Sequence, residues 1–155
     1  MKVPPLSSET LHASCVAIGG RAVLLHGRSG SGKSDLALRL IDRGAQLVSD
    51  DYTVVRRIGD GLVASAPANI AGQIEVRGIG IVRMPALDSA PLVLMALLDE
   101  LVERMPDDRP TTRPVAGMPL PVFALAALEP SAPIKLELAV DRFGLPLPAE
   151  ATARP

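Results

Sequence analysis

The stretch LLHGRSGSGKSDLALRL, residues 24–40, constrains the fold more than any other part of the chain. Residues 27–34 fit the pattern G-x-x-x-x-G-K-[ST], in which a glycine-rich loop joins a strand to a helix. An apolar run precedes this loop and an amphipathic helical pattern follows it. A chance match in a Gly/Ser-rich segment would lack that context, so the sequence predicts a phosphate-binding strand–loop–helix unit within an α/β domain.

Each residue type in the loop suits a phosphate ligand. Glycines let backbone N–H groups converge on phosphate oxygens, and the following helix directs its positive N-terminal end at the same anion. Lys33 would reach the β- and γ-phosphates as a mobile charge, and the Ser34 hydroxyl would bind Mg²⁺ as a hard oxygen ligand. The predicted nucleotide-binding residues are Gly27, Arg28, Ser29, Gly30, Ser31, Gly32, Lys33 and Ser34.

Composition limits the classes of protein that the chain can represent. With 155 residues, 48% of them hydrophobic, the chain suits one domain with a substantial core, which we place at residues 1–148 with a C-terminal tail at 149–155. The net charge of -1 disfavours nucleic-acid and membrane-surface partners. Cys15 is the single cysteine, and no segment has the length of a membrane span, so we expect a cytoplasmic protein.

The N-terminal half has clear local signals. After an irregular start at residues 1–10, a diglycine between two apolar runs predicts a hairpin turn at Gly19 and Gly20. The helix after the loop is expected to end at Gly44 in a left-handed cap. We then predict a short buried strand over residues 45–51, a hairpin over 52–65, a loop over 67–72 and mixed strand and loop over 73–85.

The C-terminal half gives weaker signals. Residues 90–106 fit either a buried strand with a polar exit or a helix, because short apolar runs do not separate the two. Residues 107–121 are proline-rich and predict a loop. Alternating apolar residues over 134–143 favour a strand, although a helix start also fits.

Asp50 and Asp51 end the first strand after the helix. That strand returns beside the glycine-rich loop, so its end should lie near the bound phosphates. One carboxylate there could hold Mg²⁺ or its water shell, and the other could accept a proton from an incoming hydroxyl. The alternative is a solvated strand end or a cap for the next element.

Three ordered segments resemble the HPr kinase/phosphorylase family. GRSGSGKSDLALRLIDRGAQLVSDD, residues 27–51, is similar to the family's G-x-S-G-x-G-K-S-E loop, A-L-x-L helix and R-G-x-x-L-V-A-D-D strand. Residues 75–81, EVRGIGI, match the family signature E-[IV]-R-G-[LMI]-G-[IL], and Leu11-His12-Ala13 matches an upstream L-H-[AG] stretch. The resemblance runs from about residue 10 to residue 83.

The resemblance implies an α/β fold with a P-loop core like that of phosphoenolpyruvate carboxykinase, a mixed sheet and few helices, assembled as hexamers. It implies a kinase that uses ATP and Mg²⁺ to phosphorylate a serine of HPr, a small carrier protein of the sugar phosphotransferase system. It also implies the reverse reaction, in which inorganic phosphate removes the phosphoryl group and pyrophosphate forms. We expect the chain to be a short form with the catalytic domain alone.

Residue roles follow from the same resemblance. Asp51 would take the serine proton in the kinase direction and return it in the reverse direction. Lys33 would clamp the β- and γ-phosphates, while Ser34 and Glu75 would hold Mg²⁺. Asp50 is a further Mg²⁺ candidate from its place at the strand end. His12 would contact a phosphate or tune Asp51. Taken alone, His12 and Glu75 also fit ordinary, partly exposed polar positions.

The chain departs from the family pattern at three places. Asp35 stands where the family has glutamate after the loop serine. Arg104, in VERMPDD, is the nearest candidate for the arginine of a family D-R-L-G stretch. Residues 129–137 lack the arginine of the P-V-x-P-G-R segment, which is tied to dephosphorylation, so the sequence favours the kinase direction.

Two other classes remain open at this stage. A small-molecule kinase could use the same loop, and a regulator could bind the nucleotide without catalysis. The Asp-Asp strand end and the signature at residues 75–81 favour the HPr kinase, because a plain regulator would not need both.

Overall fold

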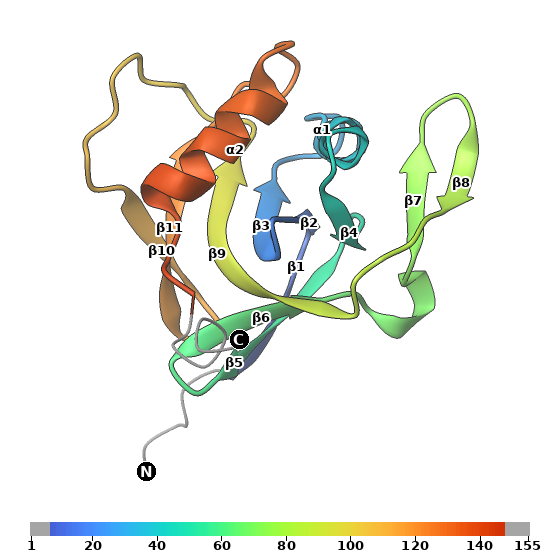
Figure 1. The fold of residues 1–155 in the computed structure, drawn as a ribbon, viewed down its shortest axis with the longest axis horizontal. Helices are drawn as coiled ribbons and strands as arrows, with labels where there is room; N and C mark the ends of the chain where they lie inside the picture. Colours follow the sequence, from blue (N-terminus) through green and yellow to red (C-terminus); the bar gives the residue numbers. More distant parts are fainter. Residues whose placement is uncertain (1–6, 148–155) are drawn as a thin grey trace.

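The computed structural model describes residues 7–147. A curled mixed sheet forms most of the molecule, and both α-helices lie over one side of it (Figure 1). In chain order the elements are β1 (Ser8–Leu11), β2 (Ala13–Ile18), β3 (Arg21–His26), α1 (Lys33–Asp42), β4 (Gln46–Ser49), β5 (Thr53–Ile58), β6 (Gly61–Ser65), η1 (Ala68–Ile70), β7 (Gln73–Val76), β8 (Gly80–Arg83), β9 (Ser89–Leu97), β10 (Thr111–Val115), β11 (Met118–Ala124) and α2 (Ala132–Phe143).

The long strand β9 joins the two parts of the sheet. The strand order is β1-β5-β6-β9-β3-β2-β4, with β11 parallel to β9 and β10 antiparallel to β11. Residues 89–91 of β9 pair with β6, and residues 92–97 pair in parallel with β3 (Figure 1). β7 and β8 form a separate hairpin. The fold is therefore mixed α/β with few helices, as the sequence predicts.

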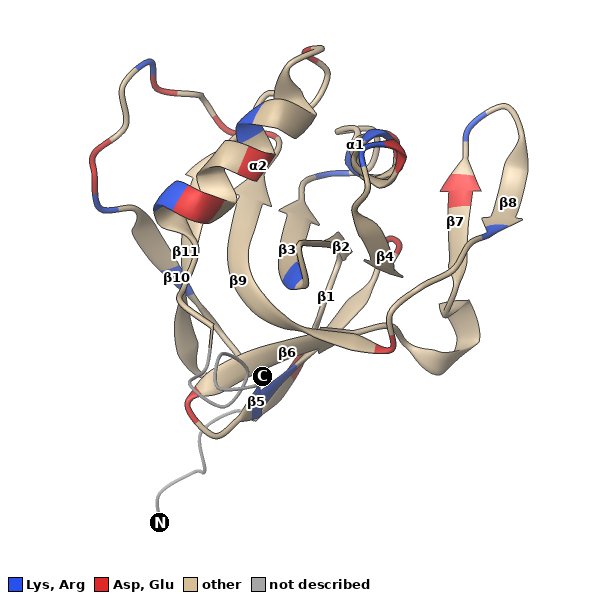
Figure 2. Cartoon of the chain, viewed as in Figure 1, with Lys and Arg blue, Asp and Glu red and all other residues tan. Residues whose placement is uncertain are grey.

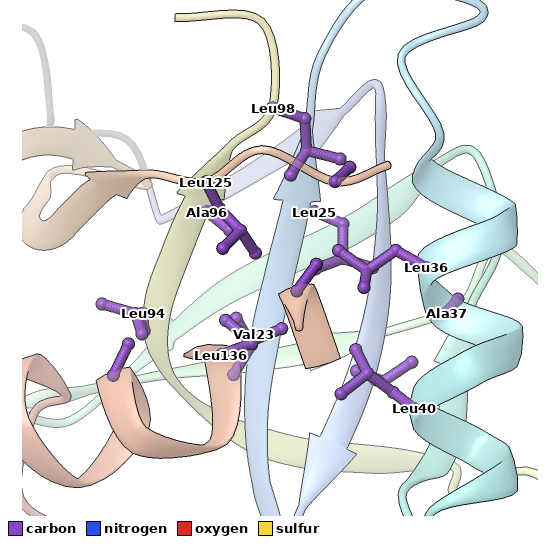
Figure 3. Packing of buried hydrophobic residues seen from close by; sticks show 14 of the residues in the cluster. Val23, Leu25, Leu36, Ala37, Leu40, Leu94, Ala96, Leu98, Leu125 and Leu136 are labelled. Carbon is purple, nitrogen blue, oxygen red and sulfur yellow. The ribbon is translucent and has the colours of Figure 1, made fainter. Parts of the chain in front are cut away.

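Alternation along β3 divides the core into two apolar layers. Val23 and Leu25 pack in one cluster with Leu36 and Leu40 of α1 (Figure 3). Leu24 points the other way, into a cluster with the second faces of β2 and β9. Since a strand buried on both faces needs apolar residues throughout, the continuous run AVLL in β3 follows from its central position.

Several local predictions are confirmed. β2 and β3 form a hairpin through Gly19 and Gly20, both with positive φ. α1 ends at Asp42, Arg43 is its C-cap residue, and Gly44 follows with φ 106°, the left-handed conformation that glycine permits. The predicted strand at residues 45–51 is present as β4, which ends at Ser49, so Asp50 and Asp51 follow the strand. Residues 53–65 form the predicted hairpin, and residues 89–97, which the sequence left ambiguous, form a strand.

The strand predicted over residues 134–143 is wrong, because α2 occupies this segment. Leu136 and Val140 are buried against the sheet, whereas Ile134 is 46% exposed and Leu138 is 65% exposed. The apparent alternation thus mixed core and surface positions. The buried set Ala132, Pro133, Leu136, Ala139 and Val140 has helical spacing, and a proline in the first turn suits a helix start.

The loop predicted over residues 107–121 is also wrong in its second half. Residues 111–124 form the β10–β11 hairpin, with Ala116 and Gly117 at positive φ in its turn. β10 pairs with β11 alone among the described strands, so Pro114 sits on a sheet edge, where its missing N–H costs little. The irregular start predicted over residues 1–10 is wrong where β1 pairs with β5.

The chain end and the surface complete the description. Residues 144–147 lie against the core, where the Leu145 N–H donates to the Val93 carbonyl, while the tail predicted at 149–155 lies outside the described residues.

Within residues 7–147, no helix is long and apolar enough to cross a membrane. Figure 2 shows basic and acidic residues interspersed on the visible face, in keeping with the small net charge.

Candidate active site

The glycine-rich loop, residues 27–34, joins β3 to α1 as the sequence predicts. Gly30 has φ 84°, and Gly32, at the N-cap of α1, has φ 98°. A Cβ on Gly27 would lie 2.5 Å from the Ser31 Oγ. The loop therefore requires glycine at these positions, for backbone conformation at Gly30 and Gly32 and for close packing at Gly27.

Polar groups inside the loop are arranged to receive an anion. Lys33 is buried, and its ammonium donates to the carbonyl oxygens of Gly27 at 2.8 Å and Arg28 at 3.1 Å. The Ser31 Oγ is buried and has no hydrogen-bond partner among the described residues. A buried hydroxyl without a partner is costly, and a ligand oxygen would satisfy it. The N-terminus of α1 adds a positive dipole end at the same place.

Asp50 connects the loop to two other parts of the chain. Its Oδ1 accepts hydrogen bonds from the Ser34 hydroxyl at 2.6 Å and the Ser14 hydroxyl at 3.0 Å, and its Oδ2 accepts one from the Glu75 N–H at 2.9 Å. Asp50 is itself buried. These three donors hold the carboxylate in one orientation beside the loop serine, where it could share a Mg²⁺ ion or a metal-bound water with Ser34.

Asp51 faces the other way and is open to solvent. Its side chain is 54% exposed, and its Oδ1 lies 2.8 Å from the His12 Nε2. The His12 ring stacks on Tyr52 with 4.9 Å between ring centroids. Asp51 has φ 67°, a strained backbone conformation for a residue with a side chain. The structure thus brings the two residues together and leaves the Asp51 carboxylate within reach of an incoming group.

Ser14 is a site residue that the sequence reasoning missed. It is fully buried on β2, where its hydroxyl donates to Asp50 and accepts a hydrogen bond from the Asp51 N–H at 3.0 Å. One side chain therefore fixes both neighbouring aspartates. The serine inside the otherwise apolar run ASCVAI could have indicated this role, because a buried hydroxyl needs hydrogen-bond partners.

We expect Ser14→Ala to lower the free energy of unfolding by about 1–3 kcal/mol, since it leaves the Asp51 N–H and the buried Asp50 short of a partner. Urea unfolding would measure the change. Ser89→Ala, at an exposed position of β9, serves as the control and should stay within about 0.5 kcal/mol of wild type. Equal stability of the two variants would contradict the role given to Ser14.

Glu75 and Asp35, two other residues singled out in the sequence, differ in whether they contact Asp50. Glu75 reaches Asp50 through its backbone N–H, while its side chain is exposed on β7. Asp35 forms an ion pair with Arg39 one turn along α1, at 3.0 Å. Within residues 7–147, no three His, Cys, Asp or Glu side chains converge into a metal-binding group, so a Mg²⁺ ion here would depend on Ser34, Asp50 and ligand oxygens.

Arg104 lies in the exposed segment between β9 and β10. This segment is tied to α2 through an ion pair between Asp108 and Arg142 at 2.9 Å. Figure 1 shows it beyond α2, on the opposite side from β7 and β8. Among the described residues, no hydrogen bond or ion pair joins Arg104 to the glycine-rich loop or to the two aspartates, so a role for it in phosphate contact remains only a prediction.

Asp99 holds the start of the loop from the end of β9. Its Oδ2 accepts the Arg28 N–H at 3.0 Å and lies 3.3 Å from the Arg28 Nε. These contacts lower the pKa of the Asp99 carboxyl below its usual range, chiefly through the backbone hydrogen bond. Asp99 is a second residue of this region that no sequence motif indicated.

His26, at the end of β3, also borders the site. Burial lowers the pKa of its imidazole; Asp99 opposes this shift, and the positive charges of Arg113, Lys33 and a protonated His12 add to it. The folded state thus binds a proton less readily than the unfolded state, whose histidine pKa is about 6.5. The contribution of His26 to the free energy of unfolding is therefore fully present above a pH of about 6.5 and is lost as the pH falls below it.

We therefore expect His26→Gln to flatten the fall in unfolding free energy between about pH 7 and about pH 5. Urea midpoints of wild type and variant at both pH values would measure the difference. An unchanged pH slope in the variant would show that His26 does not contribute to it.

Comparison with known proteins places this geometry in a family. The model of the HPr serine kinase C-terminal domain matches residues 6–90, more than half of the chain. The chain belongs to this family. The match contains His12, the glycine-rich loop, both aspartates and Glu75, so the resemblance inferred from the motifs is confirmed.

Curated relatives of the HPr serine kinase family agree over the same region. The HPr kinase/phosphorylase of Clostridium tetani is 43% identical over 90 residues, which are 57% of this chain and 30% of that protein. That of Chlorobium limicola is 48% identical over 80 residues, 50% of this chain and 24% of the relative. The matched region thus spans about a quarter to a third of the length of these relatives.

A solved structure extends the likeness beyond the matched sequence. The HPr(Ser) kinase/phosphatase from Coxiella burnetii superimposes with a TM-score of 0.74 at 28% identity, over 86% of this chain and 88% of that one. This coverage reaches past residue 90 into the C-terminal half. The curled mixed sheet with few helices is therefore an arrangement that both proteins share.

Proposed function

We propose that the chain transfers the γ-phosphoryl group of ATP, with Mg²⁺, to a serine of HPr. The observation that carries the proposal is the pair Asp50 and Asp51 at the end of β4, one facing the loop serine and the other facing solvent. Membership of the HPr serine kinase family supports the choice of HPr as substrate.

The residues present suit a nucleotide and its metal ion. The loop offers a buried lysine, an unpartnered Ser31 hydroxyl and a helix N-terminus to phosphate oxygens. Ser34 and Asp50 offer two hard oxygen ligands, close to the number that Mg²⁺ takes from protein when phosphates and water supply the rest. Bound Mg²⁺ would neutralise charge on the transferring phosphoryl group.

In the proposed kinase direction, the chain's own residues position the phosphate and move one proton. Lys33 would exchange its contacts with the Gly27 and Arg28 carbonyls for phosphate oxygens. Asp51 would accept the proton of the HPr serine hydroxyl as that oxygen bonds to phosphorus. His12, 2.8 Å from Asp51, would hold the carboxylate toward the incoming hydroxyl. Phosphoryl transfer depends mainly on such positioning and charge stabilisation.

The reverse direction belongs to the same proposal. Inorganic phosphate would attack the phosphoserine, Asp51 would return the proton to the serine oxygen, and pyrophosphate would leave. Residues 129–137 contain no arginine, and their lysine, Lys135, pairs with Glu129 at 2.8 Å. We therefore expect phosphorolysis to be slower than phosphorylation.

Four finer assignments rest on this proposal. They are a P-loop core of the phosphoenolpyruvate carboxykinase type, a homohexamer, a cytoplasmic location, and control of carbohydrate use through the phosphotransferase system. The nucleotide-binding geometry of residues 27–34 supports the first.

A phosphorylation assay tests the proposal directly. Mixing the protein with Mg-ATP and the HPr of the same organism should add one phosphoryl group to an HPr serine, as measured by intact mass and peptide mapping. Lys33→Met, which removes the charge inside the loop, should abolish most of this gain. Unmodified HPr with ATP binding intact would overturn the proposal and favour a metabolite kinase or a nucleotide-binding regulator.

A further inference from the structure

A hollow of about 810 Å³ lies beside the glycine-rich loop, and we call it the outer hollow. Its walls are residues 28–31 of the loop, residues 98–99 at the end of β9 and residues 126–130 before α2. Leu98 lies above the ends of β3 and β9 near this region (Figure 3). Its volume falls within the range of small-molecule sites.

We propose that the outer hollow holds the nucleoside part of the nucleotide, an inference that rests on the proposed function. Residues 28–31 belong both to the phosphate-binding loop and to the wall of the hollow. A ligand whose phosphates occupy the loop therefore has this space directly beside it. A second hollow, of about 310 Å³ and lined by residues around Val48 and Gly72, includes no residue of the loop.

The apolar lining suits a base. Leu98, Leu128 and Pro130 line the hollow with two alanines, and none of its lining residues is aromatic. Leu128 is 75% exposed, and its Cδ2 would lie 3.2 Å from a Cβ on Gly32, so it sits directly over the loop. A large exposed leucine beside a phosphate-binding loop is the surface that a flat base would cover.

Two carboxylates on the walls suit the hydroxyl groups of a sugar. Asp99 pairs with Arg28 through its Oδ2, and Glu129 pairs with Lys135 through its Oε2. Each pair uses one oxygen, which leaves the Asp99 Oδ1 and the Glu129 Oε1 as acceptors. Carboxylates serve sugar hydroxyls in this way in other nucleotide sites.

The wall formed by residues 126–130 is fixed to the helix that follows the loop. Arg39 of α1 donates from its guanidinium to the carbonyl oxygens of Ala127 and Glu129 while it also pairs with Asp35. The distance between Leu128 and the phosphate-binding loop is therefore held by these contacts. A nucleoside would meet a preformed surface, which lowers the entropy cost of binding.

Comparing two ligands separates the nucleoside from the phosphates. Calorimetry would measure the binding of Mg-ATP and of Mg-tripolyphosphate, which has the phosphate chain without the nucleoside. We expect wild type to bind Mg-ATP more tightly. Leu128→Ser should weaken Mg-ATP binding by about five- to tenfold, the effect of losing an apolar contact, and leave tripolyphosphate binding unchanged.

Leu138→Ser is the matched control, because Leu138 is 65% exposed on α2 and is not part of the hollow. It should bind both ligands as wild type does. Equal wild-type affinity for the two ligands, or an equal loss for both in Leu128→Ser, would overturn the nucleoside assignment while leaving the phosphate site in place. Failure of wild type to bind either ligand would overturn the proposed function as well.

Discussion

Asp51→Asn is expected to lower the rate of HPr phosphorylation on the order of 10²-fold or more and to leave Mg-ATP affinity close to that of wild type. The asparagine side chain cannot accept the serine proton, yet it retains the shape of aspartate. It also tolerates the left-handed backbone at this position, where φ is 67°. The loss should therefore appear in kcat, because the substitution leaves the proposed phosphate-binding groups of the loop untouched.

Single-turnover phosphorylation of HPr, with Mg-ATP binding followed by calorimetry, would measure the two effects separately. Asp60→Asn is the matched control, because Asp60 is an exposed aspartate in the turn between β5 and β6. It should phosphorylate HPr at the wild-type rate. A wild-type rate in Asp51→Asn would exclude Asp51 as the base.

Leu36→Ala is expected to lower the free energy of unfolding by about 2–5 kcal/mol. Leu36 is fully buried on α1 and points toward Leu25 of β3 (Figure 3). Truncation of Leu36 leaves a cavity between α1 and the sheet, in the apolar cluster that packs α1 against β3. For a chain of this length each kcal/mol corresponds to roughly 2–4 °C in Tm.

Urea unfolding and thermal melts of Leu36→Ala would measure this loss. Leu138→Ala removes the same atoms from an exposed position of α2 and should change stability by about 0.5 kcal/mol or less. A similar small change in Leu36→Ala would mean that α1 does not pack on the sheet as described.

Local sequence determined the elements that form the candidate site. Gly27, Gly30, Gly32 and the following amphipathic run specify the loop and α1, because backbone conformation and helical spacing depend on near neighbours. The position of Asp50 and Asp51 after a short apolar strand was readable for the same reason. Membership of the HPr serine kinase family was likewise visible in three short motifs.

Tertiary contacts decided the C-terminal half. Residues 134–143 alternate as a strand would, and only the sheet that they pack on selects the helical set Leu136, Ala139 and Val140 for burial. Prolines in residues 111–124 argued against strands, but Pro114 lies on β10, an edge strand among those described, where its missing N–H costs little. Such choices depend on partners that are distant in the sequence.

The candidate site also has features that the local sequence determines and features that only tertiary contacts determine. The sequence alone determined which residues could bind phosphate and carry a proton, since the spacing of the loop and the Asp-Asp pair is local. Only the folded chain brought Ser14 and the backbone of Glu75 to Asp50, Asp99 to Arg28, and Leu128 over the loop. These contacts join residues far apart in the chain, and their geometry is fixed by how β2, β7, β9 and the start of α2 pack around β3 and α1.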